Sequence, residues 1–313
     1  MKVSVVLVVH NRFKDADETL ESLVNQSKKP YEIIVIDDYS RTKYMPKIKI
    51  RDQDIMLRIY RSKRELGLGL ARSLGSYMAY GDVIAFIDDD AIADKDWIKE
   101  LIKYHSKGYD IVGGAVYPKY LSKPPNWWDL ELFSYIVSAG NYLHYPKKKI
   151  IDLIYGTNFS VKKEVFNKIG YFLPNLGRVR GKLLSGEEFE FLLRALKHDF
   201  KLGFNPRAIV YHKVFPYRFT LEYIKKRCWS QGASYTRILI LHKEYKNYIK
   251  RILGYIIYIS KDLIETISGC PQRICLSSRE SAKVHFICEL YRLSLIHISE
   301  PTRPRLISYA VFC

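Results

Sequence analysis

The sequence contains little cysteine, proline or glycine: five cysteines, 12 prolines and 17 glycines in 313 residues. The cysteines are too few and too scattered for the disulfide framework of a small secreted domain. The proline and glycine contents are too low for a fibrous or low-complexity chain. The longest uncharged apolar stretch near the end, Ile252–Ser260, is far shorter than the roughly 20 residues that cross a bilayer. The sequence therefore predicts a globular protein without a spanning helix near its end.

Acidic residues are scarce relative to basic ones. The chain has 51 Lys and Arg against 33 Asp and Glu, a formal net charge of +18. Such an excess is typical of proteins that bind nucleic acid, an anionic membrane surface or phosphorylated small molecules. Aromatic residues, at 14%, supply enough apolar surface to exclude disorder. The length fits one large domain or two small ones.

The last 21 residues do not look like part of a fold. Leu293 to Arg303 reads LSLIHISEPTR, which resembles the translation of a common sequencing adapter, and Ile307 to Cys313 resembles the translated primer site that follows that adapter. We therefore interpret residues 293–313 as a cloning or sequencing scar and exclude them. This lowers the net charge from +18 to +17 and predicts that the native C-terminus is missing.

Apolar runs alternate with amphipathic segments in residues 1–116. The expected strands are Val3–Val9, Glu32–Ile36, Met56–Tyr60, Asp82–Ile87 and Ile111–Val116. The expected helices between them are Asp15–Val24, Leu68–Tyr80 and Trp97–Tyr104. Strands that alternate with helices favour an α/β fold with a mainly parallel central sheet flanked by helices.

The pattern changes after residue 116. Residues 117–235 are expected to form a second, mixed α/β half that begins with a loop, Pro118–Trp128. Its Trp127 and Trp128 could stack on the rings of a ligand or could pack the loop itself. Residues 236–292 are expected to form a basic amphipathic helical tail. Within it, the composition of residues 243–262 suits an interfacial helix on anionic lipid, and equally a helix that packs on the rest of the chain.

Acidic residues follow two of the expected strands. Asp88, Asp89 and Asp90 come directly after Val83–Ile87, and Asp37-Asp38 ends another strand. Ligands of open α/β sheets bind at the carboxyl ends of the strands, and clustered carboxylates are tolerated when a divalent cation neutralises them. The sequence thus indicates a metal–diphosphate site, with a solvated acidic turn as the alternative.

Glu187 and Glu188 stand at the start of an expected helix, Ser185–His198. One interpretation is that the pair stabilises the start of the helix, because the helix dipole favours carboxylates there. The other is a general base that accepts a proton from a substrate hydroxyl.

Together these segments resemble the family 2 inverting glycosyltransferases with the GT-A fold. The resemblance covers about residues 1 to 235 in consecutive order. The segments that carry it are Val5–Arg12 (VVLVVHNR), Glu32–Ser40 (EIIVIDDYS), Gly67–Arg72 (GLGLAR), Gly81–Asp90 (GDVIAFIDDD), Gly156–Phe166 (GTNFSVKKEVF), Gly186–Arg194 (GEEFEFLLR) and Tyr211-His212.

The resemblance implies a role for each matching residue. Glu188, at the second acid of the family's Glu-Asp pair, would be the catalytic base, although the Glu-Glu pair leaves Glu187 as the alternative. Asp90 would bind the metal, and His212 would contact metal or phosphate, unless it is simply a half-buried histidine after a strand. The donor would contact His10, Asn11, Arg12, Asp38, Arg72, Asp88 and Asp89, of which His10, Asn11, Arg12 and Asp38 would hold the nucleobase and Asp88 the ribose.

The expected function is metal-dependent inverting transfer of a sugar from a nucleotide-diphosphate donor to a hydroxyl of a glycan, polysaccharide or lipid-linked acceptor. The expected cofactor is Mg²⁺ or Mn²⁺. The expected location is the cytoplasm, either free or peripheral on the inner face of a membrane. The alternatives are a sugar-phosphate nucleotidyltransferase and a non-enzymatic basic module that binds an anionic membrane surface. Nucleic acid is not expected as a partner, because no recognition motif of the usual kinds is present.

Overall fold

The computed structural model describes residues 1–48, 55–174, 176–179 and 181–243. Most of the expected tail, from residue 244 to 292, and the segment 293–313 lie outside the described residues. Within the described part, no helix is long and apolar enough to cross a membrane.

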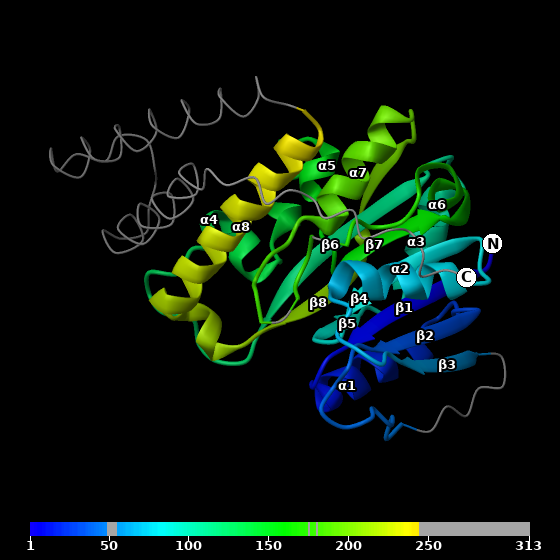
Figure 1. The fold of residues 1–313 in the computed structure, drawn as a ribbon, viewed down its shortest axis with the longest axis horizontal. Helices are drawn as coiled ribbons and strands as arrows, with labels where there is room; N and C mark the ends of the chain where they lie inside the picture. Colours follow the sequence, from blue (N-terminus) through cyan, green and yellow to red (C-terminus); the bar gives the residue numbers. More distant parts are fainter. Residues whose placement is uncertain (49–54, 175, 180, 244–313) are drawn as a thin grey trace, which may run out of the picture.

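An eight-stranded sheet forms the centre of the molecule, with the strand order β3-β2-β1-β4-β7-β6-β8-β5 (Figure 1). The strands are β1 (Val3–Val9), β2 (Glu32–Asp37), β3 (Met56–Arg61), β4 (Val83–Asp88), β5 (Ala91–Ala93), β6 (Ile111–Tyr120), β7 (Asn158–Lys162) and β8 (Leu202–Val214). Strands β3, β2, β1 and β4 are parallel. Strand β7 is antiparallel to β4 and β6, whereas β6 and β8 are parallel and β5 is antiparallel to β8.

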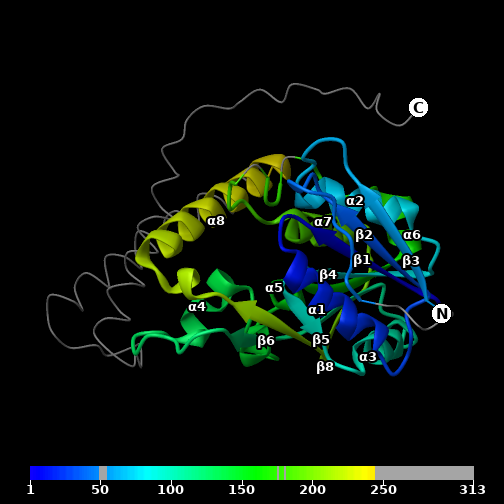
Figure 2. The same cartoon turned by 90° about the horizontal axis from the view of Figure 1, so that it is seen from below.

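Helices cover both faces of the sheet (Figures 1 and 2). The α-helices are α1 (Phe13–Val24), α2 (Leu68–Met78), α3 (Trp97–His105), α4 (Leu130–Val137), α5 (Ile150–Leu153), α6 (Lys163–Ile169), α7 (Glu187–Lys197) and α8 (Leu221–Leu241), and two 3-10 helices are η1 (Asn141–His144) and η2 (Pro216–Phe219). Apolar residues of α1 and α3 share one core with the sheet, and those of α2, α6 and α7 share another. Two-sided burial explains why β1 and β2 are nearly continuous apolar runs.

The expected α/β fold with a mainly parallel first half is confirmed, and each strand and helix expected in residues 1–116 is present. The second half is mixed, because β7 runs against its neighbours. The sheet is continuous past residue 116, since β6 crosses that position and pairs with β8 up to Tyr120.

The expectation of a loop from Pro118 onward is wrong for its first three residues, which belong to β6. Proline is tolerated there because β7 pairs only with Ile111–Gly113, so that one side of β6 has no ladder partner at Pro118. Trp127 and Trp128 pack against Phe133, and Trp128 also packs against Phe219. Of the two interpretations of these tryptophans, packing of the loop is the one that the structure shows.

Candidate active site

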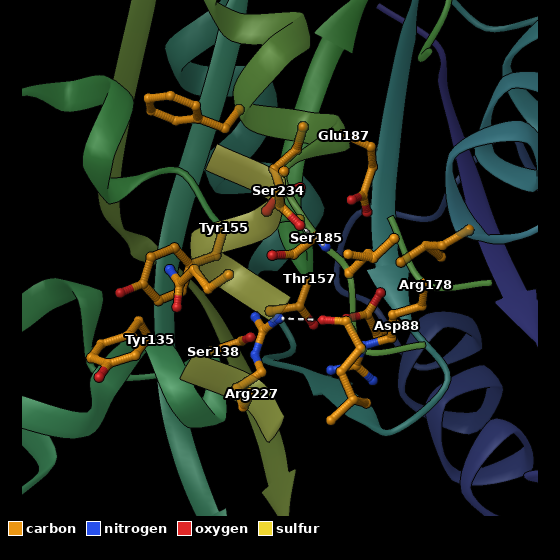
Figure 3. A pocket seen from close by; sticks show the side chains of 18 of the residues that line it. Asp88, Tyr135, Ser138, Tyr155, Thr157, Arg178, Ser185, Glu187, Arg227 and Ser234 are labelled. Carbon is orange, nitrogen blue, oxygen red and sulfur yellow. Dashed lines mark hydrogen bonds between the residues drawn. The ribbon is translucent and has the colours of Figure 1, made fainter. Parts of the chain in front are cut away.

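A cavity of about 960 Å³ opens at the carboxyl ends of β1 and β4 (Figure 3). One wall contains His10, Arg12 and Asp88, which follow or end these strands. The opposite walls come from α4, from the segment 148–157, from the start of α7 and from one face of α8. The structure therefore has a cavity at the strand ends where the acidic residues predict a binding crevice.

The short strand β5 determines where Asp90 lies. After β4 the chain reverses its direction, and β5 pairs antiparallel with β8. In this pairing Ala91 is opposite His212. The backbone N–H of Lys213 donates to the Asp90 carbonyl at 2.9 Å. This pairing brings Asp90 and His212 together although they are 122 positions apart in the chain.

Asp88, Asp90 and His212 form a possible cation site, since one ligand atom of each lies within 4.8 Å of the others. His212 Nδ1 is 2.7 Å from the Val137 carbonyl, to which it donates, and its Nε2 is 3.1 Å from Asp90 Oδ1. A backbone acceptor for Nδ1–H leaves Nε2 as the ligand atom. Two carboxylates with one imidazole suit a divalent cation such as Mn²⁺ or Mg²⁺, so the residues present fit the expected metal.

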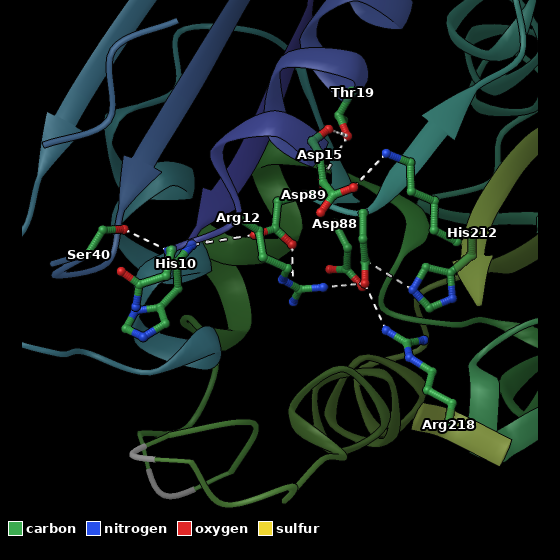
Figure 4. Close-up of polar contacts among 12 residues, drawn as sticks. His10, Arg12, Asp15, Thr19, Ser40, Asp88, Asp89, His212 and Arg218 are labelled. Carbon is green, nitrogen blue, oxygen red and sulfur yellow. Dashed lines mark hydrogen bonds and ion pairs between the residues drawn. The ribbon is translucent and has the colours of Figure 1, made fainter. Parts of the chain in front are cut away.

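Asp90 is surrounded by Arg12, His212 and Arg218, and these three side chains are labelled in Figure 4. Arg218 Nη2 lies 2.8 Å from Asp90 Oδ2, and Arg12 forms an ion pair with the same oxygen. Burial alone would raise the pKa of Asp90, but His212, Arg12 and Arg218 outweigh it and hold that pKa well below its usual value. For Asp89, burial dominates and raises the pKa, although Arg12 lies 3.2 Å away. Asp90 is thus ionised, and its two carboxylate oxygens contact His212, Arg12 and Arg218.

Arg72 connects the acidic strand end to the acidic helix start. Its Nη2 lies 2.7 Å from Asp88 Oδ1 and 2.7 Å from the Gly156 carbonyl, and its Nη1 lies 2.8 Å from Glu187 Oε1. A Cβ on Gly156 would come within 2.8 Å of Arg72 Nη1. A side chain at position 156 would therefore displace the guanidinium from its present contacts.

The two adjacent glutamates have different surroundings. Glu187 is 3% exposed and is paired with Arg72. Burial, and then the proximity of Glu188, raise the pKa of Glu187. Glu188 is half-buried and lines the cavity, and its Oε2 has no hydrogen-bond partner among the described residues. Both glutamates have a buried Oε2 without a hydrogen-bond partner among the described residues, but only Glu187 is also held by an ion pair with Arg72.

The residues expected at the nucleobase divide into two groups. His10, Arg12 and Asp38 line the cavity. The Asp38 carboxylate accepts the backbone N–H groups of Leu66 and Gly67 at 2.7 and 2.9 Å, so it also fixes the loop that precedes α2. Asn11 is exposed and is not among the residues that line this cavity.

Asn11 has a left-handed backbone, with φ of 59°. Its side-chain oxygen accepts the backbone N–H of Arg41 at 2.8 Å, and its own N–H donates to Ser40 Oγ. Asn11 therefore links the segment after β1 to the segment after β2. Its contact with the donor stays a prediction.

Sequence reasoning did not single out several residues of the site. Arg218 holds Asp90, and Arg178 together with Ser234 and Ile238 of α8 lines the cavity. The family resemblance does single out Arg227, Trp229 and Gln231 of α8 as part of a segment near the donor phosphates, with an ordinary amphipathic helix as the alternative interpretation. Arg218 lies in PYRF, which carries no motif, and its partner is 128 positions away. No local signal in the sequence could have identified it.

Sequence comparison relates the chain to known proteins. The family model for glycosyl transferase family 2 matches residues 4–170. The chain is 29% identical over 280 residues to a glucosyl-dolichyl phosphate glucuronosyltransferase of Haloferax volcanii, covering 85% of this chain and 88% of the relative. It is also 29% identical to a dolichol-phosphate mannosyltransferase of Pyrococcus furiosus, over 62% of this chain and 58% of that relative.

Among solved structures, the chain is similar to S. aureus TarS 1–349, with a TM-score of 0.49 and 19% identity. The match covers 74% of this chain and 65% of that one. The family model matches more than half of the chain, and the sheet and cavity are those expected of the GT-A fold. The chain belongs to glycosyl transferase family 2, and it is a glycosyltransferase.

Proposed function

We propose that this glycosyltransferase moves a sugar from a nucleoside-diphosphate donor to a hydroxyl of a lipid-linked or glycan acceptor, with inversion at the anomeric carbon. One observation carries the proposal: Asp88, which belongs to the candidate cation site, and Glu188 line the same cavity. A carboxylate base and a cation site are the two groups that this chemistry needs. Membership of the family favours this function over nucleotidyl transfer and over a purely membrane-binding role.

In this proposal Asp88, Asp90 and His212 hold the divalent cation. The cation, when bound, stabilises negative charge on the diphosphate leaving group. Arg12 and Arg218 add positive charge at the same place, because both contact Asp90. His10, Arg12 and Asp38 lie where the nucleoside would be held.

Glu188 acts as the base. It accepts the proton of the acceptor hydroxyl, whose oxygen forms the new bond to the anomeric carbon. The bond from that carbon to the diphosphate breaks on the opposite side, and its electron pair leaves with the diphosphate. Glu187 is a positioning residue, since Arg72 holds its carboxylate and thereby the start of α7.

Two relatives support a lipid-linked acceptor, because their names state action on dolichyl phosphate derivatives. The acceptor of this chain is then an isoprenyl lipid that carries phosphate or a phosphate-linked sugar. A lipid acceptor would place the enzyme at a membrane surface.

A donor screen tests the proposal. The purified chain is incubated with UDP- and GDP-sugars and an extract of isoprenyl lipids, and release of the nucleoside diphosphate is measured with Mn²⁺, with Mg²⁺ and with EDTA. We expect release with at least one donor, its loss in EDTA, and its loss in Asp90→Asn. Asp199→Asn is the matched control, because Asp199 is exposed and precedes the first residue of β8, whereas His212 lies near the other end of that strand. Equal release by Asp90→Asn and the control would contradict the proposed cation site.

A further inference from the structure

Buried polar atoms without partners are concentrated at the cavity. Among the described residues, six have a buried side-chain nitrogen or oxygen atom that lacks a hydrogen-bond partner. Five of the six line the cavity, namely Thr157, Glu187, Glu188, Arg227 and Gln231. Buried polar groups are normally paired, so this concentration indicates a polar ligand that completes them.

Arg227 is the unusual member of this set. Three other arginines of the site, Arg12, Arg72 and Arg218, form ion pairs with carboxylates. Arg227 is 6% exposed, and within the described chain no carboxylate forms an ion pair with it. Its Nη1 donates to the Leu183 carbonyl at 3.1 Å, while its Nε has no partner. A guanidinium that is buried without an anion is costly.

The electrostatic surroundings of Arg227 confirm the imbalance. Burial, followed by the nearby charge of Arg178, lowers the pKa of Arg227. For Arg72 and Arg218, carboxylates outweigh burial and raise the pKa. Arg227 is therefore the buried arginine of this site for which burial and a neighbouring cation outweigh the nearby carboxylates.

A second cation lies beside it. Arg178 lines the same cavity from the loop before α7, and its carbonyl accepts the backbone N–H of Leu68 at 2.9 Å, which ties the loop to the start of α2. Arg178 and Arg227 thus approach the cavity from two different elements. Figure 3 shows both side chains at the cavity.

The arrangement of α7 and α8 places Arg227 near the glutamate pair. The Ser185 N–H donates to Ser234 Oγ at 2.9 Å, which joins the start of α7 to α8. The carboxylates that act electrostatically on Arg227 are those of Glu188 and Glu187. The cations that contact Asp90, by contrast, are Arg12 and Arg218.

We propose that Arg227, assisted by Arg178, binds an anionic group of a substrate other than the donor diphosphate, beside Glu188. The shared chemistry is an oxyanion, and it has two possible sources: a carboxylate on the transferred sugar or the phosphate of a lipid-linked acceptor. The proposal rests on the proposed function, since it assumes that the diphosphate lies at the Asp88, Asp90 and His212 cluster. A planar guanidinium is suited to either anion, because it can donate two parallel hydrogen bonds to it.

The test compares charged and neutral ligands that share one nucleotide. Binding of UDP, UDP-glucose and UDP-glucuronate is measured by titration calorimetry with Mn²⁺, for the wild type, Arg227→Gln and Arg178→Gln. GDP, GDP-mannose and GDP-mannuronate replace them if GDP is the nucleotide that binds. Arg237→Gln is the matched control, because it removes an exposed arginine from the same helix. Farnesyl phosphate, with farnesol as its uncharged counterpart, serves as the acceptor probe.

If the anion belongs to the sugar, the wild type binds the uronate donor more tightly than the neutral one. Arg227→Gln then loses about 30-fold or more of the affinity for the uronate donor and keeps its affinity for the nucleoside diphosphate. If the anion belongs to the acceptor, the loss appears with farnesyl phosphate and not with farnesol. Arg178→Gln, a change at a half-buried loop residue, shows a smaller loss in the same direction.

Two results would overturn the subsite. One is an equal loss of affinity for the nucleoside diphosphate itself in Arg227→Gln, which would assign Arg227 to the diphosphate. The other is unchanged binding of every probe in both variants. Absence of binding by both UDP and GDP would instead overturn the proposed function, and this inference with it. Unchanged nucleotide affinity in a variant also shows that the variant is folded.

Discussion

Arg72 is the single residue on which the two halves of the site most depend. It holds Asp88, Glu187 and the Gly156 carbonyl at once. Lysine keeps the charge but lacks the planar fork, so Arg72→Lys leaves at least one buried carboxylate without its partner. We expect a loss of about 3 kcal/mol in the free energy of unfolding and a loss of most sugar transfer.

Arg58→Lys is the matched control for this prediction, because Arg58 pairs with buried Glu32 at 2.9 Å in a part of the sheet outside the cavity. The control is expected to lose stability and to keep its turnover. Urea unfolding and nucleoside diphosphate release measure the two properties. Equal turnover in Arg72→Lys and Arg58→Lys would show that Arg72 has only a structural role.

His105 is a residue whose titration acts on the stability of the fold. Its Nδ1 lies 3.0 Å from the Tyr109 carbonyl and its Nε2 lies 2.8 Å from Ser160 Oγ. Burial lowers its pKa to about 4, whereas in the unfolded chain it titrates near pH 6.5. Between these values the unfolded state binds the extra proton, so the contribution of His105 is complete above about pH 6.5 and is lost as the pH falls through 4.

The size of this effect follows from the difference between the two pKa values. It corresponds to a loss on the order of 3 kcal/mol in the free energy of unfolding. Chemical unfolding at several pH values measures it. His105→Gln is expected to flatten the dependence between pH 6.5 and 4, and an identical slope in the variant and the wild type would contradict the assignment to His105.

At the scale of elements, the start of α7 depends on its contact with α8. Gly186 caps α7 with φ of 92°, and a Cβ there would lie 2.8 Å from Ile238 Cδ1. Gly186→Ala therefore introduces backbone strain and displaces Ile238. We expect a cost of about 1–3 kcal/mol in stability and a fall of about tenfold to a hundredfold in turnover, because Glu188 is the second residue of α7.

Gly108→Ala separates the two effects. Gly108 has φ of 93°, and a Cβ there would have nothing within 4 Å. We expect Gly108→Ala to lose stability through backbone strain and to keep its turnover. Thermal melts and steady-state rates compare the pair, and normal turnover in Gly186→Ala would show that the position of α7 tolerates the shift.

How much the sequence predicts depends on the range of the interactions that form each element. The buried run Val83–Ile87 and the carboxylates after it are local features, so the strand and its acidic end could be predicted. Strand β5 has three residues, Ala91–Ala93, too few for a periodic pattern, yet it brings His212 to Asp90. Arg72 and Glu187 are 115 positions apart in the chain, and no local sequence pattern predicts that they pair.

The helix α8 shows the same limit. The pattern of Phe219–Leu241 predicts a helix, and the structure has one over Leu221–Leu241. That one face of this helix, with Arg227 and Gln231, forms a wall of the cavity follows only from tertiary packing. The role of α8 could therefore not be read from its amphipathic pattern.

At the scale of the whole molecule, the excess positive charge predicts attraction to anionic lipid. The chain ending at residue 292 should float with vesicles that contain anionic lipid and not with neutral vesicles, and salt should weaken the binding. A chain that ends at residue 243 tests the part played by the basic tail. Equal flotation of both chains would contradict a tail anchor. Removal of residues 293–313 should change neither binding nor turnover.

The most direct test of the central claim is the rate of sugar transfer in Glu188→Gln. With a functional donor, acceptor and Mn²⁺, single-turnover release of the nucleoside diphosphate is compared with donor affinity for the wild type and the variant. Our account predicts a fall of about a hundredfold to ten-thousandfold in the rate, with donor affinity within about twofold of the wild type. A variant that transfers the sugar at the wild-type rate would contradict the assignment of Glu188 as the base.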